Sequence, residues 1–222
     1  MRLFICFLTF IQVKSLAYNL CVVGASSGLG KELVYQTSLD RNKTVLALTT
    51  GPVIRAPCRV NSFSEIKNQP LYVSKKVTKD NYWNNLSSFD YENIIFTTSA
   101  KPFKEDYSDR LMCKILQDLP ESCKTVTLVS AHGVGDSLST KEVGIKVMND
   151  WYLKDVYRVK NEQEKMLNFN MFSVKYPKLK RYIIRPKALS YGKTVLNSVT
   201  REDLANRILD NLFTEEGIID LI

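Results

Sequence analysis

Three glycines with a characteristic spacing are the residues of this sequence best suited to chemistry. Gly24, Gly28 and Gly30 occupy the first, fifth and seventh positions of one short segment, directly after the apolar pair Val22 and Val23. Because glycine has no Cβ, Gly24 can turn sharply out of a strand, Gly28 can let the backbone approach a phosphate, and Gly30 can let a helix pack closely. The spacing therefore predicts a strand, a phosphate-binding loop and a helix in succession.

The start of this predicted helix supplies further groups for an anion. The first N–H groups of a helix lie at the positive end of its dipole and attract phosphates, and Ser26 and Ser27 can add hydroxyl donors. A glycine triplet alone is a weak signal, but its place at the first strand of a strand–helix series gives it weight. We therefore predict that a dinucleotide is bound by a loop that comprises Gly24, Ser26, Ser27, Gly28, Leu29 and Gly30.

Apolar runs of strand length alternate with helical segments along the chain. The predicted strands are 20–23, 44–48, 71–73, 93–96, 125–129 and 182–184. The predicted helices are 28–39, 80–87, 105–118, 150–172 and 201–213, the last with Thr200 as its N-cap. Continuous apolar runs are typical of strands that helices cover on both faces. The sequence thus predicts an α/β fold, a single domain with a Rossmann-type doubly wound parallel sheet.

The composition agrees with one globular domain. The chain has 222 residues, of which 45% are hydrophobic and 24% are charged. Its formal net charge is +8, but Lys and Arg are scattered and are not gathered with aromatic residues into one run. This argues against a specific nucleic-acid partner, and it leaves open both a basic groove for a phosphorylated cofactor and general solubility.

The five cysteines form no C-x-x-C pair, and His132 is the only histidine of the sequence. This argues against a zinc site, which needs several such ligands at short spacings. Cys21 lies within an apolar strand pattern, where a free cysteine usually packs as a small hydrophobic residue. We therefore predict that Cys21 is buried and has no redox role.

The first seventeen residues have the character of a signal peptide. Arg2 precedes an apolar run over residues 3–11, and the segment 15–17, Ser-Leu-Ala, then supplies small residues at the positions that a signal peptidase recognises. The run is shorter than the roughly 20 residues that span a bilayer, so no transmembrane span is expected in the mature chain. We predict a targeting segment at 1–17 and a dinucleotide-binding domain at 18–222. The destination is then the secretory pathway or an endomembrane-derived plastid, whereas a buried, uncleaved N-terminus would leave the protein in the cytoplasm.

These motifs resemble the short-chain dehydrogenase/reductase superfamily, above all its atypical NAD(P)H-binding, NAD-dependent epimerase/dehydratase-like members. The resemblance covers roughly residues 19–222. Its most specific parts are the glycine loop, the Arg-Pro turn at 185–186 and the Arg-Glu-Asp segment at 201–203. It implies a Rossmann fold with NAD(P) as the cofactor.

The resemblance also implies catalytic residues, but one of them is missing. Lys160 matches the family lysine that hydrogen-bonds the nicotinamide ribose. The family tyrosine stands four residues earlier, where this chain has Val156, and Tyr157 lies one residue late, about 100° round a helix. The family serine falls at Ser130 or at the neighbouring Ala131. The catalytic candidates are therefore Lys160, Ser130 and Tyr157, in an incomplete triad.

Other side chains could deliver a proton in place of the missing tyrosine. Tyr152 and His132 are two candidates, and bound water or the substrate itself are the others. His132 is otherwise a polar loop residue. Trp83, Trp151 and Tyr152 could line a pocket, although such residues more often anchor a core or a surface.

The segment after the second predicted strand favours NADP over NAD. NAD-specific folds place a carboxylate there for the ribose hydroxyls, whereas this chain has Thr49, Thr50 and Gly51, with Arg55 nearby. We therefore predict that Thr49, Arg55 and Lys160 also contact the cofactor, with NADP preferred and NAD possible. Lys76 stands where relatives often have an aspartate near the adenine.

Two classes of function fit these residues. One is an NADP-dependent oxidoreductase that transfers hydride to an unknown small carbonyl or conjugated substrate. The other is a non-catalytic module that binds the dinucleotide as a structural or redox-sensing ligand and engages a protein partner. The missing tyrosine favours the second class, the glycine loop agrees with both, and fold alone does not decide between them.

The glycine loop can be tested directly. Gly28→Val should weaken dinucleotide binding by at least tenfold, or about 1.4 kcal/mol, because a branched side chain would occupy the place of the phosphate. Calorimetric titration of the folded variant measures this. Unchanged affinity would remove the site from this loop.

Overall fold

The computed structural model describes residues 18–49, 71–74, 89–99, 108–134, 151–168, 174–186, 189–190, 198–211 and 217–221. The predicted segment 1–17, the predicted helix 80–87 and residues Arg55, Lys76 and Trp83 lie outside these ranges. No helix in the described part of the chain combines the length and the apolar composition needed to cross a membrane.

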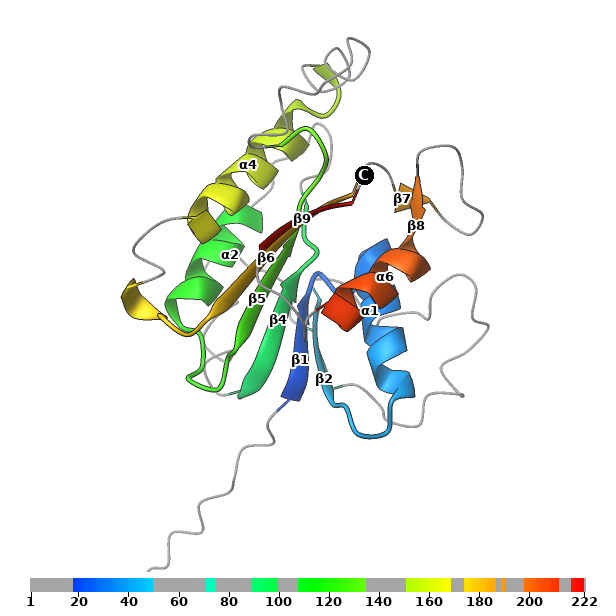
Figure 1. Ribbon diagram of the computed structural model, residues 1–222, viewed down its shortest axis with the longest axis vertical. Coiled ribbons are helices and arrows are strands. Elements are labelled where there is room, and N and C mark those ends of the chain that lie inside the picture. The colour runs from blue at the N-terminus through cyan, green and yellow to red at the C-terminus, as the bar shows by residue number, and fades with distance from the viewer. Residues whose placement is uncertain are drawn as a thin grey trace, which may run out of the picture.

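The described strands form one parallel sheet of seven strands and a small second sheet. The strands of the large sheet are β1 (Tyr18–Val23), β2 (Val45–Thr49), β3 (Leu71–Ser74), β4 (Tyr91–Phe96), β5 (Thr125–Val129), β6 (Lys180–Pro186) and β9 (Gly217–Leu221). Their spatial order is β3-β2-β1-β4-β5-β6-β9, so the order reverses between β1 and β4. All the strands are parallel, and their carboxyl ends share one edge, at the top of Figure 1. The predicted doubly wound sheet is confirmed.

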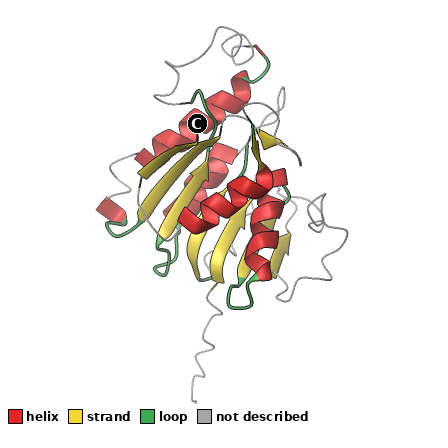
Figure 2. Cartoon of the chain, turned by 45° about the vertical axis from the view of Figure 1, so that its right-hand side comes forward, coloured by secondary structure: helices red, strands yellow, loops and turns green. Residues whose placement is uncertain are grey.

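Helices cover both faces of this sheet (Figure 2). On one face lie α1 (Gly28–Leu39) and α6 (Arg201–Asn211), and on the other lie α2 (Ser108–Gln117) and α4 (Lys154–Asn168). The helix α1 has the bounds that the sequence predicts. Thr200 caps α6 as predicted, because its hydroxyl oxygen accepts the backbone N–H of Asp203 at 3.0 Å.

The side chains of each central strand alternate between two cores. In β1, Cys21 and Val23 pack towards α2 and α4, whereas Leu20 and Val22 pack towards α1 and α6. All four are buried. Burial on both faces explains why the strands read as continuous apolar runs and not as an alternation of apolar and polar residues.

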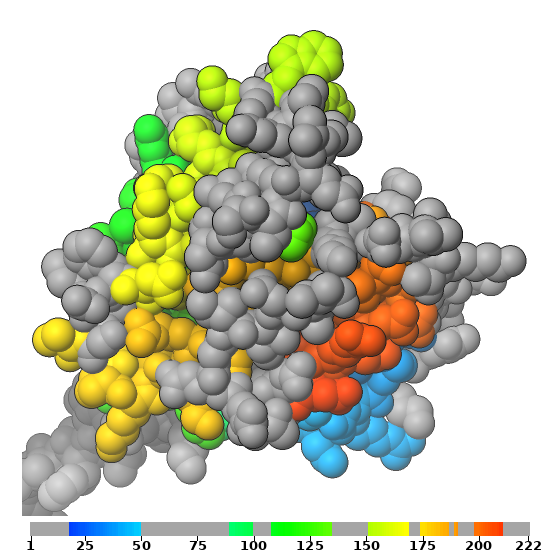
Figure 3. All heavy atoms as spheres, turned by 45° about the horizontal axis from the view of Figure 1, so that its top comes forward, coloured from blue at the N-terminus to red at the C-terminus, as the bar shows by residue number. Residues whose placement is uncertain are grey.

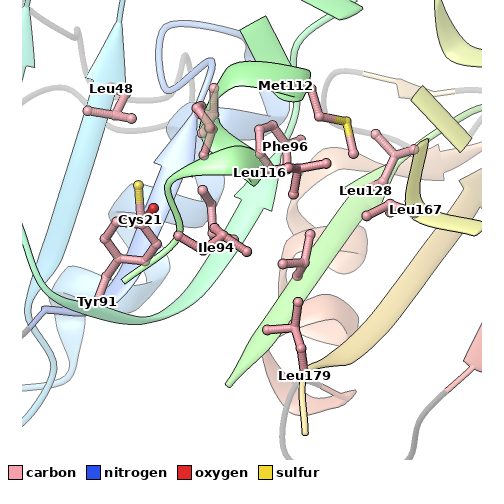
Figure 4. Close-up of a cluster of buried hydrophobic side chains, with 14 of the residues drawn as sticks. Cys21, Leu48, Tyr91, Ile94, Phe96, Met112, Leu116, Leu128, Leu167 and Leu179 are labelled. Atoms are coloured by element: carbon pink, nitrogen blue, oxygen red, sulfur yellow. The ribbon is translucent and has the colours of Figure 1, made fainter. Parts of the chain in front are cut away.

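Cys21 is fully buried, as predicted, and lies beside Tyr91 in the core on the α2 side (Figure 4). Burial raises the pKa of the Cys21 thiol well above its ordinary value, and the nearby Cys123 adds to the effect. Burial also raises the pKa of the Cys123 thiol to about 12. Both thiols therefore stay protonated at neutral pH, which makes them poor nucleophiles.

Three short strands in the described part of the chain were not predicted from the sequence. One is β9, at the edge of the large sheet, where Asp220 interrupts an apolar run of only five residues. The other two are β7 (Leu189–Ser190) and β8 (Val199–Thr200), which pair with each other in the small sheet. Segments of two residues carry no periodicity, so pattern analysis could not find them.

A chain of buried and part-buried polar contacts links β1, β4, β5 and the residue before β2 near the amino edge of the sheet. The Oδ1 of Asn19 accepts the backbone N–H of Thr44 at 2.8 Å. The Nδ2 of Asn93 donates to the Asn19 carbonyl at 2.8 Å, and its Oδ1 accepts the Thr125 hydroxyl at 2.7 Å. Because each bond is directional, these contacts fix the register of the central strands.

Asn93→Ala should lower the free energy of unfolding by about 1–3 kcal/mol, because it leaves the buried Thr125 hydroxyl without its acceptor. Urea unfolding followed by circular dichroism measures this. The exposed Asn42→Ala is the matched control and should change little. Equal midpoints for the two variants would contradict the structural role of Asn93.

Candidate functional site

The glycine loop lies where the strand order reverses, between the carboxyl ends of β1 and β4. Gly24 directly follows β1 and has φ +86°, a conformation that side chains with a Cβ rarely adopt. A Cβ added there would lie 2.9 Å from Thr97 Oγ1 and 2.9 Å from Thr98 Cγ2. Glycine is therefore required here both by the backbone conformation and by the close approach of the residues that follow β4.

Gly30 allows the loop to fold back on the first turn of α1. A Cβ at Gly30 would meet the Gly24 carbonyl oxygen at 2.3 Å, closer than any real contact of this kind. The same carbonyl accepts the backbone N–H of Ser27 at 2.8 Å. The close packing that the glycine spacing predicts at the third glycine is thus present.

The Ser27 hydroxyl has two partners inside the protein. Ser27 is the N-cap of α1, and its Oγ accepts the backbone N–H of Gly30 at 2.9 Å. Its Oγ also lies 3.0 Å from Thr97 Oγ1. The hydroxyl that the sequence analysis offered to a phosphate therefore serves the loop itself, whereas the exposed Ser26 keeps its side chain at the surface.

Thr97 joins β4 to the glycine loop, and the sequence analysis missed it. Its Oγ1 lies 3.0 Å from the carbonyl oxygens of both Val23 and Gly24, and its backbone N–H donates to Val23 at 2.9 Å. The available signal was weak: a hydroxyl residue directly after an apolar strand. Only the pairing of β1 with β4 reveals its partners.

The N-terminus of α1 retains free donors at this edge. Within the described residues, the backbone N–H groups of Gly28 and Leu29 have no hydrogen-bond acceptor, and the first turn contains no acidic residue. Such an end attracts an anion because its N–H groups and the helix dipole act together. The loop therefore has the geometry of a phosphate site.

Lys160 reaches the same edge of the sheet from α4. Its side chain is buried, and its Nζ donates to the carbonyl oxygens of Thr98 and Val129, each at 2.6 Å. Thr98 follows β4 and Val129 ends β5. The ammonium group therefore lies at the carboxyl ends of two neighbouring strands, and Figure 3 shows that α4 and α6 flank this face of the molecule.

The other two catalytic candidates are Ser130, which directly follows β5, and Tyr157 of α4, which contacts the segment after β5. The Tyr157 hydroxyl donates to the His132 carbonyl at 2.8 Å, so its proton is engaged by the main chain. Ser130 is buried, and its Oγ has no hydrogen-bond partner in the described part of the chain. A buried hydroxyl without a partner is costly, and a ligand that bonds to it would remove this cost.

No protein-family model matches this sequence, and no curated protein sequence matches it. Solved structures do match. ChuY, an anaerobilin reductase from Escherichia coli O157:H7, has 15% identity and a TM-score of 0.58 over 92% of this chain and 96% of its own. A short-chain dehydrogenase from Burkholderia cenocepacia J2315, in complex with NADP, has 12% identity and a TM-score of 0.60 over 92% and 87%. A short-chain dehydrogenase from Streptomyces avermitilis has 13% identity and a TM-score of 0.62 over 92% and 88%.

The chain has the fold of the short-chain dehydrogenases/reductases. This confirms at the level of the fold the resemblance that the glycine loop and the Arg-Pro turn indicated. At these identities the likeness concerns the fold alone, so the activity of each neighbour is a property of that neighbour.

The other residues that the sequence suggests for contact with a cofactor or substrate do not lie together in the structure. Thr49 ends β2 with a buried side chain, and Arg55 lies outside the described residues. His132 is half-buried, and its backbone N–H donates to Pro186. Trp151 and Tyr152 are exposed at the start of the α4 region, with 76% and 45% of their surfaces accessible. They belong to the surface and not to the core.

A buried ion pair close to Lys160 was not predicted from the sequence either. Glu164 of α4 and Arg185 of β6 bond through two pairs of atoms, and each side chain is only 3% exposed. The signal was present as an arginine at the end of an apolar strand and a glutamate one helical turn after Lys160. Neither residue alone indicates its partner.

Thr97→Val should lower the free energy of unfolding by about 1–2 kcal/mol, because the isosteric side chain loses every hydroxyl contact with the loop. Thr97→Ser keeps the hydroxyl and should retain most of the free energy of unfolding. Thr127→Val is the matched control, because the buried Thr127 hydroxyl has no partner in the described part of the chain. Urea unfolding measures all three, and equal losses at positions 97 and 127 would refute the role of Thr97.

Proposed function

We propose that this chain binds NADP(H) at the carboxyl edge of the sheet and acts as an oxidoreductase on a small carbonyl or conjugated substrate. The observation that carries the proposal is the Lys160 ammonium group, buried at the ends of β4 and β5 on the same edge as the glycine loop. A lysine at this edge is suited to the ribose of a dinucleotide whose pyrophosphate occupies the loop. The neighbour that was solved with NADP supports this choice of ligand.

The residues at this edge fit such a cofactor. Among the described residues, the N–H groups of Gly28 and Leu29 lack acceptors, and the buried Ser130 hydroxyl has no partner. When bound, NADPH supplies a hydride. The preference for NADP over NAD rests on the absence of a carboxylate at Thr49, Thr50 and Gly51, and on the positive charge of Arg55.

The chain's own residues would have two tasks in this reaction. Lys160 orients the ribose and places a positive charge near the reacting centre, and Ser130 donates a hydrogen bond to the substrate oxygen. Proton delivery is the weak step, because Val156 replaces the family tyrosine and the Tyr157 hydroxyl donates to His132. Positioned general acids contribute about 10²–10⁴-fold, so the reaction should be slow. The proton then comes from His132, Tyr152, water or the substrate.

A second function has its own support. A non-catalytic domain that binds the dinucleotide as a structural or redox-sensing ligand for a protein partner needs the loop and Lys160 but no acid. The engaged Tyr157 hydroxyl and Val156 both agree with this reading. A targeting role of residues 1–17, and with it entry into the secretory pathway or a plastid, is also part of the proposal.

The cofactor can be identified by titrating the purified protein with NADPH, NADH, NADP and NAD. We expect NADPH to bind at least about tenfold more tightly than NADH. Lys160→Ala should weaken NADPH binding even if no substrate turns over, because its ribose contacts are lost. Consumption of NADPH with a panel of carbonyl substrates then separates the two functions. Failure to bind any of the four dinucleotides would overturn both.

Catalysis can be tested by restoring the missing phenol. Val156→Tyr places a hydroxyl one helical turn before Lys160 on the same face of α4, and turnover of a carbonyl substrate should rise by up to about 10²-fold. Val156→Phe has the same ring without the hydroxyl and is the control. Rapid turnover by the unaltered protein that does not depend on Lys160 would show that the active site lies elsewhere.

A further inference from the structure

A bidentate ion pair anchors α4 to the sheet. The Nε of Arg185 donates to Glu164 Oε1 at 3.1 Å, and its Nη2 donates to Glu164 Oε2 at 2.7 Å. Both side chains are almost fully buried. Two parallel bonds between a planar guanidinium and a carboxylate fix the orientation of the two groups as well as their separation.

This pair lies one helical turn from Lys160. Residues four apart share one face of a helix, so Lys160 and Glu164 both face the sheet, and both are buried. Lys160 bonds to carbonyl groups at the ends of β4 and β5, whereas Glu164 bonds to β6. Successive turns of α4 are thus tied to three neighbouring strands.

The strand that carries Arg185 also holds the end of β5. Ile184, the residue before Arg185, accepts the backbone N–H of Ser130 at 2.7 Å. Val129, whose carbonyl accepts the Lys160 ammonium, pairs in register with Ile184. A displacement of α4 relative to Arg185 would therefore also displace Lys160 relative to its acceptor on β5.

The contribution of this buried ion pair to the stability of the fold does not by itself explain its presence. Removing two charges from water is costly, and well-packed apolar residues of similar volume are often as stable. An apolar contact has no direction, however, and it tolerates small rotations of a helix. A rotation by one residue turns a helix face by about 100°, which would carry a lysine away from its ligands.

We propose that Glu164 and Arg185 are a positioning pair that sets the rotation and height of α4, so that the Lys160 ammonium group stays at the carboxyl ends of β4 and β5. The functional role of this positioning rests on the function proposed above, in which Lys160 contacts the ribose of NADP(H). Neither residue touches the cofactor, and both act through Lys160.

The paired variant E164Q/R185M tests the proposal in the protein without cofactor. It removes both charges at similar volume, so that the protein can still fold. In ¹H–¹⁵N spectra of ¹⁵N-lysine protein, the buried Lys160 ammonium should give a signal protected from exchange, assigned by its loss in Lys160→Met. We expect the signal to disappear in E164Q/R185M and to persist in Leu167→Ala, which only opens the core beneath the same helix.

Cofactor binding gives a second, independent readout. E164Q/R185M should raise the Kd for NADPH at least about tenfold in the unaltered background, but less than about twofold in the Lys160→Met background, because the pair then has nothing to position. A merely structural pair would weaken binding equally in both backgrounds. If E164Q/R185M fails to fold, Arg185→Lys keeps the charge but loses the two parallel bonds, and it replaces that variant.

The outcomes separate this proposal from the proposed function. If the protein binds no NADPH, the function fails, and the ammonium signal alone decides the positioning role. The positioning role is overturned if the unaltered protein shows no protected ammonium signal, if that signal survives in E164Q/R185M, or if binding weakens equally in both backgrounds.

Discussion

The parallel pairing of β1 with β4 is the contact on which the candidate site depends. Val23 pairs with Phe96, and the ladder continues one step further, because the Thr97 N–H donates to the Val23 carbonyl. The chain leaves β1 towards α1 and leaves β4 towards α2, on opposite faces of the sheet. The chain therefore turns to opposite faces of the sheet after these two strands, and the glycine loop begins there, at the position where open α/β sheets bind their ligands.

The two edges of the sheet differ in whether their buried side-chain polar groups have hydrogen-bond partners. At the amino edge, the Thr125 hydroxyl donates to the Asn93 side chain, which in turn donates to the Asn19 carbonyl of β1. At the carboxyl edge, the Ser130 and Thr98 hydroxyls lack partners in the described part of the chain. Buried polar groups are normally paired, so a ligand that bonded to these two hydroxyls would remove the cost of leaving them unpaired. This asymmetry agrees with a cofactor at the carboxyl edge.

Local patterns in the sequence predicted most of the fold, and contacts between distant residues explain what was missed. The glycine spacing and the apolar runs identified α1 and β5 with correct bounds, because each signal lies within one segment. The tasks of Ser27 and Thr97 depend on residues about seventy positions apart, and those of Glu164 and Arg185 on residues twenty-one apart. A serine in a glycine loop suits a phosphate or a helix cap equally well, and only the neighbouring strand decides between them.

The groups that hold Lys160 in place are separate from position 156, where the proposed function would need an acid. The ion pair and the carbonyl groups that hold Lys160 lie on the sheet and on later turns of α4, and none of these contacts involves the position of Val156. The presence of valine and not tyrosine at position 156 therefore does not affect the contacts of Lys160. The Tyr157 hydroxyl, one residue further round the helix, instead bonds to the main chain after β5 and steadies that segment. The contacts of Lys160 would thus be the same whether or not position 156 carried the acid of the proposed reaction, which is why binding and turnover have to be measured separately.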